Sequence, residues 1–400
     1  MAGQPTHNAT RAIARRPVRP RVVIAGGGVA ALETLLALQA LARDRVDVTI
    51  VEPELMFVDR SMAVVEPFKG RRVRGVRVQD VADECGARWL RRTVDRVEHA
   101  QRVAVTRDGI RLPYDMLVLA VGARRPERRW PSDGQLTFQD GRDGPNYRLL
   151  LHHLRTGRVN RLAFVRPPGP SWPLPLYDLA LLTAADCADH GRSSAALSLI
   201  TPEPEPLGIF GARVSGAVRE LLEDAGVALF TSSVGVPTRS GWLDLSPGEG
   251  RIPVDRVVTE PRLTGPRLRG VPCDRDGFIH TDLYGRVPGL DGVFAAGDAT
   301  DFPIKQGGLA AQQADVVAEM IASSVDPEQR PQPLRPVLRG TLRTGGVARY
   351  LRADISGGAG DDSTISTAPL WSPPNTVWGR YLAPYLSQDD LAVPVAMGAR

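Results

Sequence analysis

The sequence predicts an α/β protein made of two doubly wound, Rossmann-like dinucleotide-binding domains and a C-terminal extension. Three observations predict it. A short apolar, β-branched segment at residues 22–25 leads into a glycine-rich turn and then a helical pattern. The same order of strand, helix and strand begins again at Arg161. A further buried strand with Gly297-Asp298 at its end comes much later, so the first domain is expected to be discontinuous.

The predicted elements alternate in the way that parallel sheets require. Strands are expected at residues 22–25, 47–51, 91–94, 102–106, 109–112, 116–120, 161–165, 196–200, 227–230, near 255–260 and near 293–296, and helices at 29–42, 78–85, 176–188, 217–225 and 309–323. Residues 55–75 look irregular, and a connection of this length usually has a function. Residues 124–145, rich in Arg, Pro, Gly and Asp, are expected to form a linker.

Four regions follow from this pattern. We expect a basic tail at 1–20, a first domain formed by 21–155 and 278–330, a second domain at 156–277, and the extension at 331–400. The tail contains arginines, Pro and Thr but no apolar core of a signal peptide, so it is predicted to be disordered. No apolar run approaches the ~20 residues needed to cross a bilayer. A cytoplasmic protein is expected, with peripheral contact at the inner membrane face left open.

Charge and cysteine content narrow the possible functions. The net charge is +5 over 400 residues, but the basic residues are spread along the chain and do not alternate with aromatic residues, so no nucleic-acid surface is expected. Cys85, Cys187 and Cys273 are scattered without a paired spacing. This pattern favours a reducing compartment and predicts neither a redox disulfide nor a metal site.

The glycine-rich turn has the spacing of a dinucleotide-binding motif, Gly26-x-Gly28-x-x-Ala31. Gly26 permits a tight turn, and Gly28 lets the backbone approach a pyrophosphate. Ala31 allows the helix to lie close to the strand, and the helix N-terminus directs free N–H groups toward the anion. Glu52, at the end of the next strand, can accept hydrogen bonds from a ribose 2′-hydroxyl. The first domain is therefore predicted to bind an adenine dinucleotide.

The second domain departs from this motif at the corresponding turn. Residues 166–175 contain Ser171 and Pro173 where glycines are expected, and proline has no N–H to offer a phosphate. Trp172 is bulky where the first domain has Gly27, although Glu203 after the next strand could still hold a ribose. Two interpretations stay open: a modified nicotinamide site, or a module that kept its fold and lost its ligand.

Lys305 stands out because Lys69 is the only other lysine in the chain. It lies shortly after Gly297-Asp298, at the edge of the sheet where ligands bind, and just before a predicted helix. A compact ammonium here suggests that a charge is needed where a guanidinium would not fit. The alternative is a solvated surface lysine.

Three motifs in this order resemble the pyridine nucleotide-disulphide oxidoreductase superfamily. They are the glycine turn with Glu52, residues 114–122 ending in Gly122, and residues 293–298 ending in Asp298. The resemblance covers about residues 22–323. Within it, the proline-rich loop before Tyr177-Asp178 and residues 305–308 are similar to the branch of sulfide:quinone oxidoreductases and type II NADH dehydrogenases.

The resemblance implies FAD in the first domain, with NAD(P)H as a candidate co-substrate. It assigns the pyrophosphate and ribose to Gly26, Gly28 and Glu52, and it places Val94 beside the adenine. It brings the Gly122 backbone near the cofactor and Asp298 to its ribitol-phosphate end. The predicted cofactor-binding residues are Gly26, Gly28, Ala30, Ala31, Glu52, Val94, Gly122, Gly297, Asp298, Lys305 and Gln306. Lys305 is also the predicted catalytic residue, since a cation and a helix dipole would stabilise the negative charge of a reduced flavin.

The expected activity is an FAD-dependent oxidoreductase that passes electrons from a reduced nicotinamide to a quinone or other small acceptor. Sulfide oxidation is disfavoured, because Trp172 stands where that branch tends to have a cysteine and no cysteine follows Cys273. Two alternatives remain: a sulfur-compound or quinone oxidoreductase that does not use nicotinamide, and a non-catalytic flavin-binding redox sensor. The aromatic residues Trp371, Trp378, Tyr381 and Tyr385 are expected to pack on the flavin domain, with an interfacial patch as the alternative. The partners are small molecules, and the oligomeric state is left open.

Overall fold

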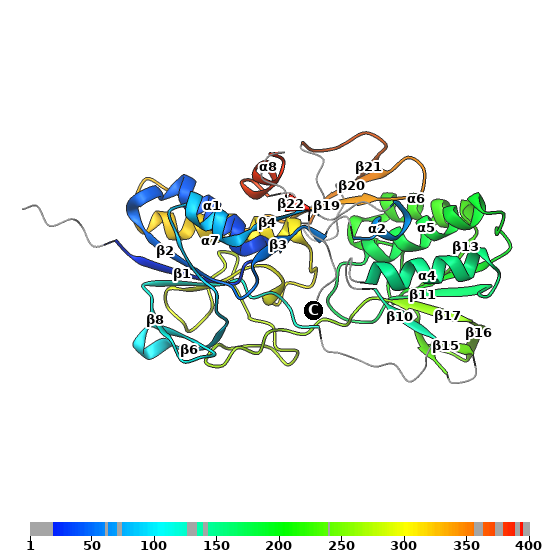
Figure 1. The fold of residues 1–400 in the computed structure, drawn as a ribbon, viewed down its shortest axis with the longest axis horizontal. Coiled ribbons are helices and arrows are strands. Elements are labelled where there is room, and N and C mark those ends of the chain that lie inside the picture. The colour runs from blue at the N-terminus through cyan, green and yellow to red at the C-terminus, as the bar shows by residue number, and fades with distance from the viewer. Residues whose placement is uncertain are drawn as a thin grey trace, which may run out of the picture.

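The fold was determined from a computed structural model (Figure 1), which describes residues 19–60, 63–69, 74–125, 134–138, 143–238, 241–355, 363–372, 379–388 and 393–394. Most of the predicted basic tail, and Trp378, lie outside these residues. Two modules stand side by side in Figure 1, with the first drawn in blue, cyan and yellow and the second in green.

The first module is a five-stranded parallel sheet with the order β18-β9-β1-β2-β5. Its strands are β1 (Arg21–Ala25), β2 (Asp47–Val51), β5 (Arg88–Leu90), β9 (Met116–Leu119) and β18 (Val293–Ala295). β1 and β9 are buried almost throughout, because helices and loops cover both faces of a parallel sheet. The helices α1 (Val29–Leu41) and α7 (Gly307–Ser323) pack against each other on one face. The late strand β18 pairs with β9, so the first module is discontinuous, as predicted.

The second module repeats this arrangement in a sheet with the order β10-β17-β11-β12-β13. Its strands are β10 (Gln135–Thr137), β11 (Arg161–Val165), β12 (Ala196–Ile200), β13 (Val227–Phe230) and β17 (Arg256–Thr259), and its helices are α4 (Gly144–Arg155), α5 (Leu174–Asp189) and α6 (Ala212–Asp224). Every pair in this sheet is parallel. The predicted fold class, two doubly wound modules with an extension, is confirmed.

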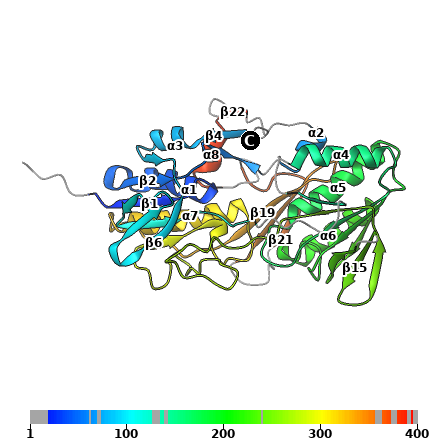
Figure 2. The same ribbon diagram turned by 60° about the horizontal axis from the view of Figure 1, so that its bottom comes forward.

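The remaining elements form small sheets and short helices around these modules. They are α2 (Glu66–Lys69), α3 (Val78–Glu84) and α8 (Leu382–Leu386), with the sheets β3 (Met56–Val58), β4 (Arg74–Arg77) and β22 (Val393–Pro394); β6 (Val94–Glu98), β7 (Val103–Thr106) and β8 (Arg111–Pro113); β14 (Val234–Pro237), β15 (Trp242–Ser246) and β16 (Gly250–Pro253); and β19 (Val337–Leu342), β20 (Arg349–Asp354) and β21 (Ser363–Ser366). β19 contacts both α5 and α7, and Figure 2 shows it between the modules.

Several local predictions were wrong. The expected linker contains β10, which pairs with β17 as the edge strand of the second sheet. The strand expected at 91–94 is two strands, β5 and β6, separated by residues 91–93. Residues 55–75, expected to be irregular, include β3 and part of β4, and β14–β16 and β19–β21 were not predicted. The domain boundary at residue 156 stays a prediction. β10 and α4, which come before this residue in the chain, lie with the second sheet and its core.

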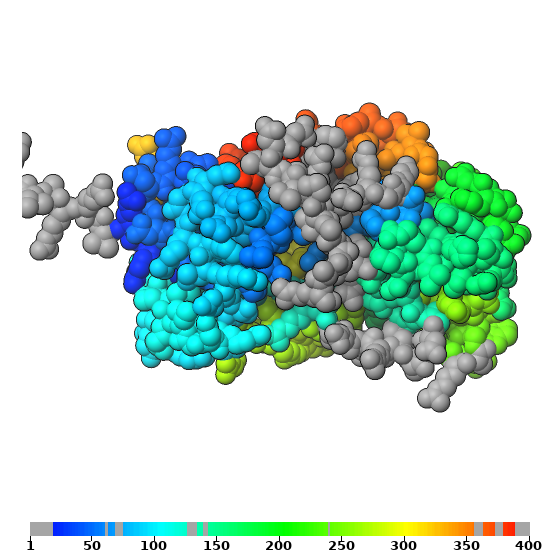
Figure 3. Space-filling model, in the orientation of Figure 1, coloured from blue at the N-terminus to red at the C-terminus, as the bar shows by residue number. Residues whose placement is uncertain are grey.

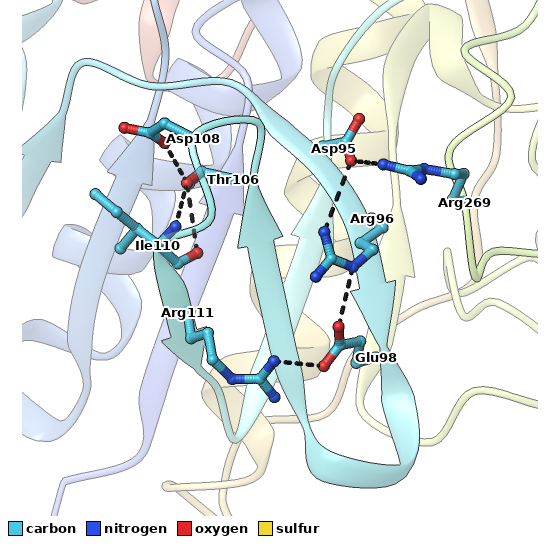
Figure 4. Close-up of polar contacts among 8 residues, drawn as sticks. All are labelled: Asp95, Arg96, Glu98, Thr106, Asp108, Ile110, Arg111 and Arg269. Atoms are coloured by element: carbon cyan, nitrogen blue, oxygen red, sulfur yellow. Dashed lines mark hydrogen bonds and ion pairs between the residues drawn. The ribbon is translucent and has the colours of Figure 1, made fainter.

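The chain returns from the second module to the first along the three-stranded sheet β6-β7-β8 (Figure 4). The Arg269 side chain pairs with Asp95 of β6, while the Val97 N–H donates to the Arg269 carbonyl at 2.9 Å. On the same sheet, Glu98 accepts from Arg96 at 2.9 Å and pairs with Arg111 at 2.7 Å. Exposed ion pairs contribute little stability each. The effect of the two Arg269 contacts is positional, because they hold the returning segment against the first module before it forms β18.

The C-terminal segment is held on the first module by a buried carboxylate. Glu33 of α1 is fully buried and accepts backbone N–H groups from Tyr381 at 2.8 Å and Leu382 at 2.7 Å. Tyr381 and Tyr385 pack on the core between α1 and α7, and the Tyr385 hydroxyl donates to Glu84 at 2.9 Å. For these two tyrosines the expected packing is confirmed. Trp371 contacts Tyr350 instead, with 5.6 Å between the ring centroids.

Replacing Glu33 with Ala should release this segment, because two buried N–H groups would lose their acceptor. We expect a loss of about 1–3 kcal/mol in the free energy of unfolding, measured by denaturant titration. Hydrogen exchange should rise at the Tyr381 and Leu382 amides. Glu33→Gln keeps one acceptor oxygen and should lose less stability. Equal losses in the two variants would contradict this role of Glu33.

Candidate functional site

The glycine turn lies at the carboxyl end of β1, beside β9. Gly26 has φ +119°, and a side chain there would collide with the Ala120 carbonyl. Its own N–H donates to the Val51 carbonyl at 2.9 Å, which joins the turn to β2. Gly28 is the N-cap of α1 with φ −80°, and a Cβ at this position would meet no atom within 4 Å. Gly26 is therefore needed for the backbone itself, whereas the space at Gly28 is open for a ligand.

A cavity of about 590 Å³ opens above this turn and gathers most of the predicted cofactor-binding residues. Gly28, Ala30, Glu52, Gly122, Gly297 and Asp298 line it. Gly26 and Ala31 lie beneath it, in the turn and in the buried face of α1, and Val94 is buried among core residues at the start of β6. Lys305 and Gln306 line an adjoining pocket.

Glu52, the residue predicted to contact the ribose, lies at the end of β2 beside the glycine turn. Its Oε1 accepts the Glu54 N–H at 2.9 Å, and its side chain lies against Gly27, where a Cβ would clash. Burial raises the pKa of the Glu52 carboxyl, and the N–H groups of Glu54 and Gly27 partly offset this effect. The carboxyl group is thus fixed beside the glycine turn and lines the cavity.

The sequence reasoning did not identify the outer wall of this cavity. Met56, Phe57, Asp59 and Arg60, from β3 and the residues after it, line the cavity together with Arg125. The only signal was the length of the irregular connection after β2. No spacing rule in the sequence could have identified which of its residues line the cavity.

The far end of the cavity is formed where β18 leads into α7. The Gly297 N–H donates to the Gln313 side chain of α7 at 2.6 Å. The residue has φ +77°, and its Cα lies so close to α1 that an added Cβ would be 3.0 Å from Ala30. Asp298 follows in the cavity wall. Burial raises the pKa of its carboxyl, against the lowering effect of Lys305 and Arg125.

Lys305 is buried, with 5% of its surface exposed, and the alternative of a solvated lysine is therefore wrong. Its Nζ donates to the Thr300 carbonyl at 2.5 Å and lies 3.8 Å from the centroid of the Phe278 ring. Burial lowers the pKa of the Lys305 ammonium to about 8, although Asp298 and other carboxylates oppose the shift. A cation over an aromatic face and beside a carboxylate is held in place without solvent.

The segment that carries Lys305 also joins the modules. The Lys305 N–H donates to the Ser171 carbonyl of the proline-rich loop at 3.2 Å. Gln306 caps α7 by accepting the Leu309 N–H at 2.9 Å, and its amide donates to the Arg339 carbonyl of β19 at 2.9 Å. The start of α7 is thus fixed by both the second module and the C-terminal extension.

A second pocket of about 250 Å³ lies between the modules and shares Arg60, Arg125, Asp298 and Gly307 with the larger cavity. Figure 3 shows a hollow beside the blue part of the chain, with yellow-green atoms at its floor. Its apolar lining comes mainly from the second module and the segment after β3: Ala63, Val64, Phe138, Trp172, Leu174, Pro175, Pro261 and Leu263. Its polar lining includes Glu260, Lys305 and Asp178, whose carboxylate accepts the Arg343 guanidinium at 2.9 Å.

The carboxyl end of the second sheet is filled by the chain itself. Glu203 accepts the Tyr177 hydroxyl and the Thr201 hydroxyl, each at 2.8 Å, so one of its oxygens is already engaged. The Arg166 guanidinium donates to the Ser171 hydroxyl at 3.1 Å and lies 4.0 Å from Glu203. Glu260, at the end of β17, is beside the first turn of α5, where the Leu176 N–H lowers its pKa. In a dinucleotide-binding module, a phosphate of the nucleotide would lie at this helix N-terminus.

Comparison with known proteins supports the predicted family resemblance. Residues 180–315 match the family model described as pyridine nucleotide-disulphide oxidoreductase. No curated protein matches the chain. Among solved structures, the sulfide:quinone oxidoreductase from the hyperthermophilic bacterium Aquifex aeolicus superposes with a TM-score of 0.77 and 17% identity, covering 87% of this chain and 86% of that one.

Two further neighbours have the same fold. A covalent putidaredoxin reductase–putidaredoxin complex gives a TM-score of 0.61 at 18% identity, covering 84% of this chain and 82% of that one. An NAD-dependent persulfide reductase from A. fulgidus gives 0.58 at 15% identity, covering 83% and 64%. The predicted resemblance to the pyridine nucleotide-disulphide oxidoreductase superfamily is confirmed.

The larger cavity has the features that a flavin dinucleotide of this superfamily requires. The cradle at Gly28 is free of side chains, the N-terminus of α1 faces it, and Glu52 lies at its rim.

Within the described residues, no helix is long and apolar enough to cross a membrane.

Substituting the two turn glycines should separate folding from cofactor binding. Gly28→Ala should leave the stability of the flavin-free protein unchanged, because the added Cβ meets no protein atom. It should weaken FAD binding at least about tenfold, equivalent to 1.4 kcal/mol, because the methyl group would occupy the pyrophosphate approach. Gly26→Ala should impair folding itself. Thermal unfolding and FAD titration measure both effects, and full FAD affinity in Gly28→Ala would contradict the assigned cradle.

Lys305→Met should make the midpoint potential of the bound flavin more negative. A shift on the order of 30 mV corresponds to about 1.4 kcal/mol for a two-electron couple. The wild-type ammonium is charged below about pH 8 and neutral above it, so the difference should be largest below pH 8 and should shrink above it. A pH-independent difference would show that the Lys305 charge does not act on the flavin.

Proposed function

We propose that this chain is an FAD-dependent oxidoreductase that passes electrons from a reduced nicotinamide through the flavin to a quinone or other small acceptor. The observation that carries the proposal is the 250 Å³ pocket, which adjoins the predicted cofactor cavity through four shared residues. When bound, the flavin supplies two-electron chemistry. The role of the chain is to hold the flavin and to place an acceptor beside it.

The cofactor would be held by the residues of the larger cavity. Gly28 and the N-terminus of α1 would receive the pyrophosphate, Glu52 the adenosine ribose, and Asp298 the ribitol-phosphate end. Lys305 would stabilise negative charge on the reduced ring from a site that excludes water. Gln306 and Ser171 would keep this lysine in place by fixing the backbone on either side.

The chemistry of the smaller pocket favours a flat, largely apolar acceptor. Trp172 packs on Phe210 with 5.8 Å between ring centroids, and Val64 and Leu174 are buried beside it. Polar and charged side chains, among them Asp178, Lys305 and Gln306, share the lining with these apolar groups and could orient the ligand. The three cysteines, all within the described residues, line neither pocket, so the arrangement favours a quinone over a sulfur compound.

The filled carboxyl end of the second sheet favours a second candidate, in which the donor is not a nicotinamide. Glu203 is bonded to Tyr177 and Thr201, and Glu260 lies at the position of a phosphate. The family description names a pyridine nucleotide, which supports the first candidate. A flavin-binding redox sensor without turnover is the third candidate, and multiple turnover with an artificial acceptor would exclude it.

Anaerobic mixing of the FAD-loaded protein with NADH or NADPH decides between the first two candidates. We expect loss of the oxidised-flavin absorbance with one of the two nucleotides and its return when duroquinone is added. Absorbance that persists with both nucleotides but falls with a chemical reductant would reject the nicotinamide donor and retain the acceptor. Trp172→Ala should raise the duroquinone KM by roughly tenfold, since burial of an aromatic contact is worth about 1–2 kcal/mol.

A further inference from the structure

Glu260 differs from the other charged groups that line the smaller pocket. Asp178 is paired with Arg343, and Lys305 donates to the Thr300 carbonyl. Both carboxyl oxygens of Glu260 are shielded from solvent, and neither has a hydrogen-bond partner of acceptable geometry. A buried carboxylate without donors is costly, whereas a neutral carboxylic acid is not. This arrangement therefore favours the protonated form.

The charged groups around Glu260 act in opposite directions. Arg166, after β11, lowers its pKa, while Glu203, after β12, raises it. The N–H of Leu176 in the first turn of α5 also lowers it. Burial outweighs these effects and raises the pKa of Glu260 to about 8. At neutral pH the residue is thus a neutral acid in the wall of a pocket that is otherwise largely apolar.

We propose that Glu260 is the proton donor to the acceptor that is reduced in this pocket. The inference rests on the proposed function, in which the pocket takes a quinone-like molecule. A quinone becomes a quinol by gaining two electrons and two protons. The reduced flavin supplies two electrons and one proton as a hydride equivalent. The Glu260 O–H bond breaks, an O–H bond forms on the acceptor, and a carboxylate remains until it regains a proton from water.

The position of Glu260 explains why this acid belongs to the second module. It follows β17 directly, at the carboxyl end of the sheet, where a dinucleotide would otherwise approach α5. The helix N-terminus that could hold a phosphate instead faces this carboxyl and stabilises the charge that it acquires after donation. Proton donation by a positioned side chain contributes about 10²–10⁴ in rate.

Glu260→Gln tests the proposal, because glutamine keeps the shape and neutrality of the acid but cannot donate its proton in this way. We expect the kcat for duroquinone reduction to fall at least about 100-fold, with KM unchanged within about twofold. Thermal stability at neutral pH should be unchanged, since the wild-type side chain is already neutral. Glu260→Asp, which keeps the proton at a shorter reach, should recover part of the rate. Glu205→Gln, at an exposed glutamate of the same module, is the matched control.

Infrared difference spectroscopy provides a readout that needs no turnover. Subtracting the Glu260→Gln spectrum from the wild-type spectrum should reveal the carbonyl band of a protonated carboxylic acid. We expect this band to be lost as the pH rises through about 8 and to shift when oxidised duroquinone binds. Full activity of Glu260→Gln, or the absence of this band, would overturn the proposal. A wild-type protein that reduces no quinone would instead overturn the proposed function, and the infrared shift would still report whether Glu260 meets the acceptor.

Discussion

Burial of the Lys305 ammonium is the constraint on which the rest of the site depends. An ammonium without solvent must have compensating partners, and these come from Thr300, Phe278 and Asp298 on the returning segment of the first module. The backbone of the same residue binds the proline-rich loop of the second module. The residue that would set the charge beside the flavin thus also makes one of the hydrogen bonds that join the two modules. Lys305 therefore contributes both to the charge of the site and to the contact between the modules.

The two modules show how one topology can serve two purposes. Both have five parallel strands, four of which follow the same order while the edge strand differs, and both place a helix N-terminus at the carboxyl end of the sheet. In the first module glycines leave that place open, whereas in the second module Glu203, Tyr177 and Glu260 fill it. Glu260 lies beside the first turn of α5, at a helix N-terminus of the kind that holds a phosphate in a dinucleotide-binding module.

Sequence reasoning reached the two modules because their signals are local. Apolar runs and the Gly26-x-Gly28 spacing are set by neighbouring residues, and Glu52 follows from a fixed distance along one strand–helix–strand unit. β10 and β19–β21 were missed because their strands are short or half-polar and form only through partners distant in sequence. The wall formed by Phe57 and Arg125 was missed for the same reason. The partners of Glu33 lie more than three hundred positions away, at Tyr381 and Leu382.

The two titrating groups of the smaller pocket have opposite chemistry but meet at the same pH. Burial lowers the pKa of Lys305 to about 8 and raises that of Glu260 to about 8, because a low-dielectric environment disfavours the charged form of each. Below that pH Lys305 is therefore a cation and Glu260 a neutral acid. This combination attracts electrons to the lysine side of an acceptor and offers a proton from the glutamate side. Above it the lysine is neutral and the glutamate is charged, so the summed charge of the two groups changes from positive to negative. A reaction that adds electrons and protons together should therefore proceed below about pH 8. The burial that separates the pocket from water sets this pH limit, because it shifts both pKa values.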